Sequence, residues 1–449
     1  MNVHYLPNEI LVKIIHSLTN LNDVLNCRRV CRHWNNLILK FGTKVETLYY
    51  NVSSDIIKDY EGQNVIAQNK RLRRRNLKFL FSLLPNLKRI GIHGCSPRPI
   101  IYDLIGDYFK HLQGLCVSDT TLSEDSFIRL MESLPNLKIL TFSRKAKDFD
   151  KEMPTIDITQ GLKIASSLKS IHLSGNFEID DSFQFHESLE ELDIDFVDDF
   201  HYFSPLNYEN LLQKCVNLRR LCVYGFFPLM VVFHNTFPKL EHFEWNKKDD
   251  SHDFEVLEYV ETIRAARDFN SLPNLKTLVI KFFDDVLNCG LNDVSEDELL
   301  YATCDMQMYL VNFLPNLKNL CLDSGCDLKV LTDKCPKIER LQFNGSLTPK
   351  LEDSLCHLFG NLKHLKELRV VSRCITVACI RIIVDACKNL ERLYLDGSFS
   401  SNEGRAILTK LCSELNREII FDEDTKCYET FWRDDWLNKF IDPTPEDCY

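Results

Sequence analysis

A short pattern of alternating apolar and polar positions recurs twelve times along the chain, in the form L-x-x-L-x-apolar. The copies begin at Leu87, Leu112, Leu137, Leu168, Leu189, Leu218, Leu240, Leu275, Leu317, Ile338, Leu365 and Leu390. Such alternation predicts a short strand whose apolar side chains share one face. The copies lie roughly 28 residues apart, which is a typical period for the units of a solenoid. We therefore expect a stack of units that each contribute one strand.

A stereotyped segment precedes many of these strands. Leu84-Pro85-Asn86-Leu87-Lys88 recurs in the segments 134–138, 272–276 and 314–318. Proline disfavours helical conformation in the residue before it, so this segment predicts the end of a helix. Each unit should therefore contain a helix, a turn and a strand, and the predicted fold class is an α/β solenoid.

The first forty residues follow a different pattern. Leu6-Pro7 suits the first turn of a helix, and Asn22 or Asp23 is a suitable cap for a second helix. Apolar residues at helical spacing form two groups, which are Ile10, Leu11, Ile14, Ile15 and Leu18, and then Val30, Cys31, Trp34, Leu37 and Ile38. A helical segment of this size is marginal as a domain on its own. We expect it to dock on a partner or on the solenoid.

These N-terminal residues resemble an F-box. The residues that carry the resemblance are Leu6-Pro7-x-Glu9-Ile10-Leu11-x-x-Ile14-Ile15-x-x-Leu18, then Asp23-Val24-Leu25-x-Cys27, then Val30-Cys31-x-x-Trp34-x-x-Leu37, in the order and spacing of that family. One departure is that Phe41–Tyr50 lacks a further tryptophan often found there. An ordinary helical cap on the solenoid is the alternative, and it would explain the apolar spacing but not the ordered motifs.

With the repeats behind it, the chain resembles the F-box and leucine-rich-repeat proteins. The resemblance implies a non-catalytic substrate-recognition subunit of an SCF (cullin-RING) E3 ubiquitin ligase. In that family the F-box binds the SCF adaptor, and through it the cullin and RING subunits, while the repeats bind a protein substrate. By the same resemblance, the adaptor contact would include Leu6, Pro7, Ile10, Leu11, Val30 and Trp34.

The patterns divide the chain into four parts. They are an F-box over 1–45, a linker over 46–76, a leucine-rich-repeat horseshoe with parallel concave strands and outer helices over 77–420, and a tail over 421–449. The linker holds the basic run Lys70–Arg75, which is interpreted as a charged helical face, a nuclear import signal or a nucleic-acid patch. In the tail, Trp432, Trp436 and Phe440 fall on one helical face and are expected to cap the last repeat; the alternative is a helix that binds a partner.

Substrate contacts are expected two, four and six residues past the first leucine of each copy, where side chains should line the concave face. A middle group contains the acidic Asp193 and Glu244 with Tyr224, and a C-terminal group contains Arg340, Arg369, Arg392 and Tyr394. The guanidinium group of arginine can donate two parallel hydrogen bonds to a carboxylate or phosphate. The C-terminal group therefore predicts binding of an acidic or phosphorylated substrate segment. The alternative is a mixed solvated surface. An acidic insertion over 284–308 is a further candidate contact or a solvated loop.

Charge, cysteine spacing and the absence of known motifs argue against several classes of function. The net charge of −11 disfavours nucleic-acid binding. The eighteen cysteines show no C-x-x-C spacing and no secretion signal precedes them, so we expect reduced thiols, no zinc site and a cytoplasmic and/or nuclear location without membrane insertion. No catalytic or cofactor motif is recognisable, so neither an enzyme nor a cofactor is predicted. A repeat scaffold that does not direct degradation is the rival function.

Overall fold

The computed structural model describes residues 6–18, 20–52, 64–67, 74–93, 100–118, 122–144, 155–175, 177–196, 210–224, 237–247, 272–282, 311–312, 314–322, 328–344, 359–372, 377–397, 410, 413 and 420–422. These residues belong to two compact units. The first unit contains the elements from α1 to β7, and the second contains those from β8 to β15. The basic residues 70–73, the 284–308 insertion and the tail aromatics lie outside the described residues.

Three short helices open the first unit, namely α1 (Asn8–Ser17), α2 (Leu21–Val30) and α3 (Arg32–Phe41). They enclose a core of Leu11, Ile15, Val24, Trp34, Leu37 and Ile38, as the apolar spacing predicts. Pro7 precedes α1 directly. The predicted cap of α2 is wrong by two or three positions, because the Asn20 side chain accepts the hydrogen bond from the Asn22 amide at 2.8 Å. Asn20 lies before the first turn, where an extended backbone lets its side chain reach that amide.

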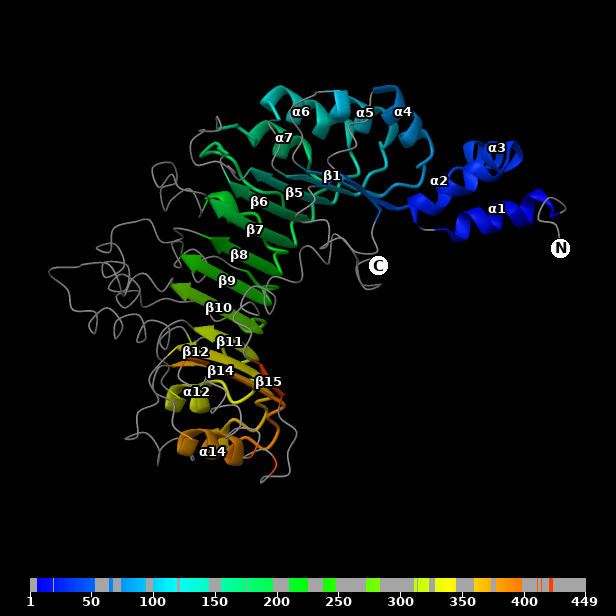
Figure 1. Ribbon diagram of the computed structural model, residues 1–449. Helices are drawn as coiled ribbons and strands as arrows, with labels where there is room; N and C mark the ends of the chain where they lie inside the picture. The colour runs from blue at the N-terminus through cyan, green and yellow to red at the C-terminus, as the bar shows by residue number, and fades with distance from the viewer. Residues whose placement is uncertain are drawn as a thin grey trace. The chain divides into compact units, whose positions relative to one another are not determined.

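The rest of the first unit consists mainly of strands that alternate with helices. The elements are β1 (Thr47–Val52), β2 (Val65–Ala67), α4 (Arg74–Ser82), β3 (Arg89–His93), α5 (Ile100–Tyr108), β4 (Gly114–Ser118), α6 (Glu124–Ser133), β5 (Ile139–Arg144), α7 (Thr159–Ile164), β6 (Ser170–Gly175) and β7 (Glu191–Phe196). The strands are parallel, in the order β2-β1-β3-β4-β5-β6-β7. The helices α4 to α7 follow one another along one side of this sheet (Figure 1). The described segment 177–190 between β6 and β7 contains no helix, so the prediction of a helix in each unit is wrong there.

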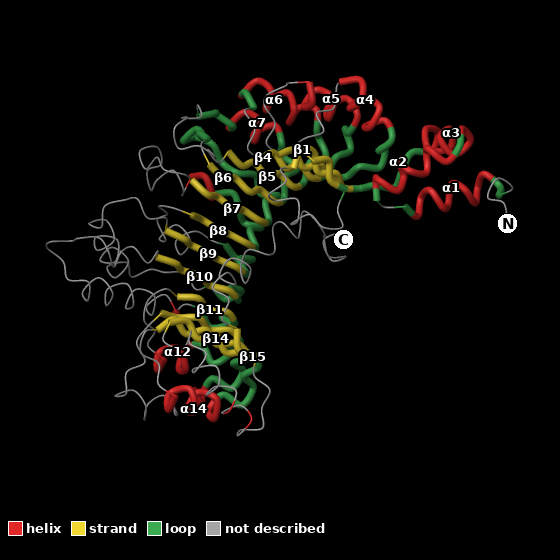
Figure 2. The backbone as a smooth tube through the Cα atoms, viewed as in Figure 1, coloured by secondary structure: helices red, strands yellow, loops and turns green. Residues whose placement is uncertain are grey.

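The second unit continues the same construction. Its elements are β8 (Arg220–Tyr224), β9 (His242–Lys247), β10 (Thr277–Phe282), β11 (Asn319–Leu322), α12 (Leu328–Lys334), β12 (Arg340–Asn344), β13 (Glu367–Ser372), α14 (Val377–Ala386), β14 (Arg392–Gly397) and β15 (Ile420–Asp422). The strands are parallel and neighbour one another in chain order. Figure 2 shows them as successive yellow segments, with α12 and α14 in red.

Each of the twelve predicted copies contributes one strand, from β3 to β14, which confirms the predicted parallel-stranded solenoid. The register aligns equivalent positions of neighbouring copies, as where Leu368 lies beside Leu393. The first apolar residue of each copy is buried, and the apolar strand residues pack against helix side chains. Phe127 of α6 and Phe142 of β5, for example, place their ring centroids 5.3 Å apart.

The segment predicted as a linker contains a further strand. β1 pairs with β3 in the register of the repeats, with Leu48 beside Ile90. Val45, Leu48 and Tyr50 reproduce the apolar spacing of the pattern and are buried. The pattern therefore starts one unit earlier than predicted, in a copy that has valine in place of the first leucine and tyrosine at the third apolar position. Arg74 and Arg75, the described end of the basic run, are exposed at the start of α4.

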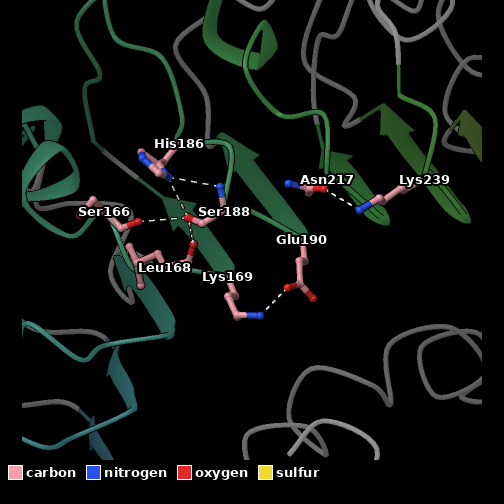
Figure 3. Close-up of polar contacts among 8 residues, drawn as sticks. All are labelled: Ser166, Leu168, Lys169, His186, Ser188, Glu190, Asn217 and Lys239. Atoms are coloured by element: carbon pink, nitrogen blue, oxygen red, sulfur yellow. Dashed lines mark hydrogen bonds and ion pairs between the residues drawn. The ribbon is translucent and has the colours of Figure 1, made fainter. Parts of the chain in front are cut away.

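The Leu-Pro-Asn-Leu-Lys segment ties each unit to the one before it. The Asn274 side-chain amide donates to the Pro238 carbonyl at 2.6 Å, and that of Asn316 donates to the Pro273 carbonyl at 2.8 Å. Where serine replaces asparagine, the Ser188 hydroxyl contacts the Ser166 and Leu168 carbonyls at 3.0 and 2.8 Å (Figure 3). The asparagine thus donates a hydrogen bond to a backbone carbonyl of the preceding turn, which would otherwise bond to water.

The lysine of the same segment forms ion pairs between neighbouring units. Lys169 meets Glu190 at 2.6 Å (Figure 3), and Glu339 receives both Lys318 at 2.7 Å and Lys366 at 2.9 Å. Hydrogen bonds from Lys318 and then from Lys366 lower the pKa of Glu339 to about 2. The recurrent lysine therefore links neighbouring units. In the sequence, this segment predicted only the end of a helix.

The repeated cysteines are buried, as predicted. Cys215, Cys335 and Cys387 occupy equivalent positions, and the Cys335 thiol lies 3.3 Å from the Leu314 carbonyl of the preceding unit. Burial raises the pKa of both Cys215 and Cys335 to about 12. Among the described helices, none has the length and apolarity needed to cross a bilayer.

Candidate functional site

Apolar side chains are exposed on the first two helices. Ile10 and Ile14 are 41% and 36% exposed, and their separation of four residues places them on one face of α1. Pro7 is exposed in front of that helix, and Val30 at the end of α2 is 59% exposed. Exposed apolar side chains grouped on so small a domain are typical of a surface that binds another protein.

The other predicted adaptor residues are less accessible. Leu6 is half-buried and packs against the helical core, while Leu11 and Trp34 are 0% and 7% exposed within it. In this conformation Leu11 and Trp34 have almost no surface to offer a partner. We assign them to the core that fixes α1 and α3, because a/d-type apolar positions point inward in any small helical bundle. Ile14, which belongs to the F-box motif but was not among the predicted adaptor contacts, joins the exposed set.

The helical segment docks on the start of the solenoid. The Thr43 amide donates to the Leu83 carbonyl at 3.1 Å, and the Asn86 side chain donates to the Thr43 carbonyl at 2.7 Å. Leu83 is part of the helical core, and the Arg28 guanidinium lies 4.2 Å from the centroid of the Phe79 ring. We call this set of contacts the junction. The Asn86 bond has the same form as the bonds between repeats, so the turn after α3 serves as the preceding unit of the stack.

The strands present a second surface, which we call the polar face. It consists of the side chains two, four and six residues past the first apolar residue of each copy. In the first unit, β7 contributes Glu191, Asp193 and Asp195 to it, and β6 supplies a partner for each. Ser170 donates to Glu191 at 3.1 Å, His172 Nδ1 lies 3.1 Å from Asp193, and Ser174 donates to Asp195 at 3.0 Å. Asp193 is buried and lies against His172 of the neighbouring strand. It therefore has little free surface for the substrate contact that the sequence predicts.

In the second unit, the predicted residues Tyr224 and Glu244 are also buried, with Glu244 only 2% exposed. The Glu244 carboxylate lies 3.7 Å from His242 Nε2 and 3.9 Å from Cys222 Sγ. Neither His242 nor Cys222 was predicted as a site residue. The register places them together, because Cys222 lies directly beside Glu244 on the neighbouring strand.

The predicted arginines lie together at the C-terminal end of the polar face. The register sets Glu367 between Arg340 and Arg392, and it sets Arg369 beside Tyr394. Glu367 is buried and lies 3.5 Å from Arg340 and 3.7 Å from Arg392, while both of these arginine side chains remain 46% exposed. Contacts with Tyr394 and then Glu367 raise the pKa of Arg392. Two guanidinium groups thus flank one carboxylate, and a third arginine, Arg369, lies two residues further along the central strand.

Comparison with known proteins supports the N-terminal assignment. A family model described as F-box-like matches residues 3–41, which include α1, α2 and α3. The comparison with curated proteins gave no match. The matched segment carries both the exposed apolar residues and the core that positions them, and it ends where the junction begins. The chain therefore contains an F-box-like domain at residues 3–41, followed by a solenoid of parallel strands.

Proposed function

We propose that this protein is the substrate-recognition subunit of an SCF-type ubiquitin ligase. The observation that carries the proposal is the F-box-like match over residues 3–41, a domain with exposed apolar residues on α1 and α2. F-box proteins are generally non-catalytic adaptors, so the ubiquitin-transfer chemistry would come from the cullin and RING subunits. These subunits would be reached through the adaptor.

The F-box-like domain and the repeats would bind different partners. Pro7, Ile10, Ile14 and Val30 would contact the adaptor, and the repeats, which resemble leucine-rich repeats, would hold a protein substrate. Tethering both partners to one chain raises the effective concentration of the substrate at the ligase without any chemistry in the chain itself. The junction supports this arrangement, because the F-box-like helices share a core residue, Leu83, with the first repeat. We propose a cytoplasmic and/or nuclear location for this activity.

We further propose that the arginines of the polar face bind an acidic or phosphorylated segment of the substrate. Arg340 and Arg392 are half exposed and flank a single carboxylate, and Arg369 lies on the strand between them. Charged hydrogen bonds to carboxylates or phosphates are stronger than neutral ones, and guanidinium forks can bind both oxygens of such groups. Glu367 would hold the arginines apart and in place before the ligand arrives.

Adaptor binding is tested by co-purification from cells with the full chain. Ile10→Asp with Ile14→Asp should lose the adaptor and the cullin together, because the charges lie on the exposed face and not in the core. The matched control is Asn22→Asp with Asn36→Asp, which adds the same charge at exposed positions of α2 and α3. Capture of adaptor by the Ile10/Ile14 variant at the level of the control would overturn the proposal.

Substrate recognition needs a second experiment, because a scaffold with an F-box would also bind the adaptor. A partner retained by the Ile10/Ile14 variant is added to the reconstituted ligase, and its ubiquitylation is followed. Arg369→Glu with Arg392→Glu should abolish capture of an acidic partner, whereas Lys334→Glu with Lys363→Glu, at exposed positions off the strands, should not. Binding without ubiquitylation would favour the scaffold, and unchanged capture by the arginine variant would exclude the arginine site.

A further inference from the structure

Three side chains with metal-ligating atoms converge on the polar face of the second unit. They are Cys222 on β8 and His242 and Glu244 on β9, and their ligand atoms all lie within 4.8 Å of one another. The parallel register puts Cys222 beside Glu244, and His242 lies two residues earlier on the same face of β9. We propose that Cys222, His242 and Glu244 bind a zinc ion, although the cysteine spacing in the sequence predicts no zinc site.

The spacing of the three atoms fits such an ion closely. Zinc binds sulfur at about 2.3 Å and nitrogen or oxygen at about 2.0–2.2 Å, so tetrahedral geometry separates its ligand atoms by roughly 3.3–3.7 Å. Here the carboxylate oxygen of Glu244 is 3.9 Å from the thiol and 3.7 Å from the imidazole nitrogen. These two separations are close to the tetrahedral range, and the Cys222 and His242 ligand atoms lie within 4.8 Å of each other.

Burial and charge favour an ion at this position. Cys222 and Glu244 are 0% and 2% exposed, and a buried carboxylate needs a compensating charge. With a thiolate and a carboxylate as ligands, a divalent zinc ion makes the cluster neutral. A mixed set of sulfur, nitrogen and oxygen ligands suits zinc better than magnesium or calcium, which prefer oxygen alone. On the other side of β9, the register neighbours of His242 and Glu244 are the uncharged Thr277 and Val279.

The competing arrangement is an ion pair without metal. His242 in its charged form would compensate Glu244 at 3.7 Å, and Arg220, the register neighbour of His242 on β8, carries a further positive charge. Cys222 distinguishes the two arrangements. In the ion pair the Cys222 thiol donates a hydrogen bond to the Glu244 carboxylate at 3.9 Å, whereas as a thiolate it would be a principal zinc ligand.

Three protein ligands leave one tetrahedral position for water or for a side chain of a bound protein. Because the cluster lies on the polar face, that position would belong to the surface on which we place substrate binding. The zinc proposal does not depend on the F-box or on ligase activity. Its failure would leave adaptor binding untouched, and adaptor binding can fail while zinc binds.

The test uses the full chain, stripped of metal with a chelator and titrated with zinc, and with cobalt as a spectroscopic probe. We expect one tightly bound zinc per chain and a sulfur-to-cobalt charge-transfer band. Cys222→Ser should abolish that band, and both Cys222→Ser and Glu244→Gln should weaken zinc binding by roughly 100-fold or more, beyond the loss typical of outer-shell changes. Binding should also weaken at acidic pH, because the ligands must lose their protons.

The matched control is Cys321→Ser. Cys321 is buried at the equivalent position of its repeat on β11, but its register neighbours are Val279 and Gln342, which are not zinc ligands of this kind. This variant should bind zinc and cobalt as the unchanged chain does, and circular dichroism shows that each variant is folded. Equal zinc binding by the unchanged chain and the Cys222→Ser variant would overturn the proposal in favour of the ion pair.

Discussion

Replacement of Gly42 by alanine tests the junction most directly. Gly42 follows α3 with φ +67° and ψ −161°, a conformation that residues with a Cβ rarely adopt. A Cβ built there would lie 2.4 Å from Cγ and 2.6 Å from Cδ of Pro85, both in a stiff ring. The glycine is therefore required both by its backbone conformation and by the close approach of the first repeat.

The magnitude follows from these two effects. Residues held in such sparsely populated regions cost about 1–3 kcal/mol, and overpacking of a tight contact costs about 1–3 kcal/mol more. We expect Gly42→Ala to destabilise the junction by roughly 2–6 kcal/mol. The neighbouring Thr43 amide, which donates to the Leu83 carbonyl, should then exchange its hydrogen roughly 30-fold faster or more, since about 1.4 kcal/mol corresponds to a factor of ten.

Hydrogen exchange of peptides that cover the junction is the appropriate assay, because a chain of several units is not expected to unfold in one step. Gly360→Ala is the control. Gly360 is helical, and a Cβ there would meet nothing within 4 Å, so alanine should stabilise its own region by about 0.5–1 kcal/mol. If Gly42→Ala left exchange at the junction unchanged, the contact with Pro85 would not hold the F-box-like helices on the first repeat.

Three further predictions concern the repeats. Asn274→Ala should lower the free energy of unfolding of the second unit by about 0.5–1.5 kcal/mol in denaturant, because it removes one turn hydrogen bond; an unchanged value would contradict this role. Glu339 has a lowered pKa, so its paired carboxylate contributes stability above its ordinary pKa that is lost as pH falls towards about 2. Glu339→Gln should cost at most about 1 kcal/mol at pH 7, and progressively less in acid, as this exposed pair is screened by solvent; a cost that grows in acid would refute the assignment. Native Cys215 and Cys335, with pKa values of about 12, should resist alkylation at pH 8 until the chain unfolds, as read by mass spectrometry; rapid labelling of the native protein would show that they are not buried.

The solenoid could be predicted because its signal is local and repeated. Each strand needs only two or three alternating apolar residues, and twelve copies make the period recognisable even where a single copy is weak. The same dependence on leucine explains why the first unit was not predicted, because Val45 takes the first position, which leucine or isoleucine holds in the twelve predicted copies. The helical core of the F-box-like domain was predictable from its spacing for the same reason.

The candidate sites were only partly predictable. The exposure of Ile10 and Ile14 and the burial of Leu11 and Trp34 depend on how three helices pack, which residue identity alone does not specify. The pairing of Asp193 with His172 likewise depends on the neighbouring strand. An acidic residue on a strand is a free binding group only if the adjacent unit does not already supply its partner.

The sequence by itself therefore determined the class of fold, the position of the F-box-like domain, the location of the strands and the burial of the repeated cysteines. The fold class and the strands follow from a short apolar pattern repeated roughly every 28 residues. The F-box-like domain follows from ordered motifs between Leu6 and Leu37, and the burial of the cysteines from their equivalent positions in the repeats. Only the tertiary structure decided which side chains of separate units meet. Asn86 with Thr43, Arg392 with Glu367, and Cys222 with Glu244 are each separated by at least 22 residues in the chain. The lengths of the connecting segments and the parallel register bring them together, and neither is encoded in any short motif.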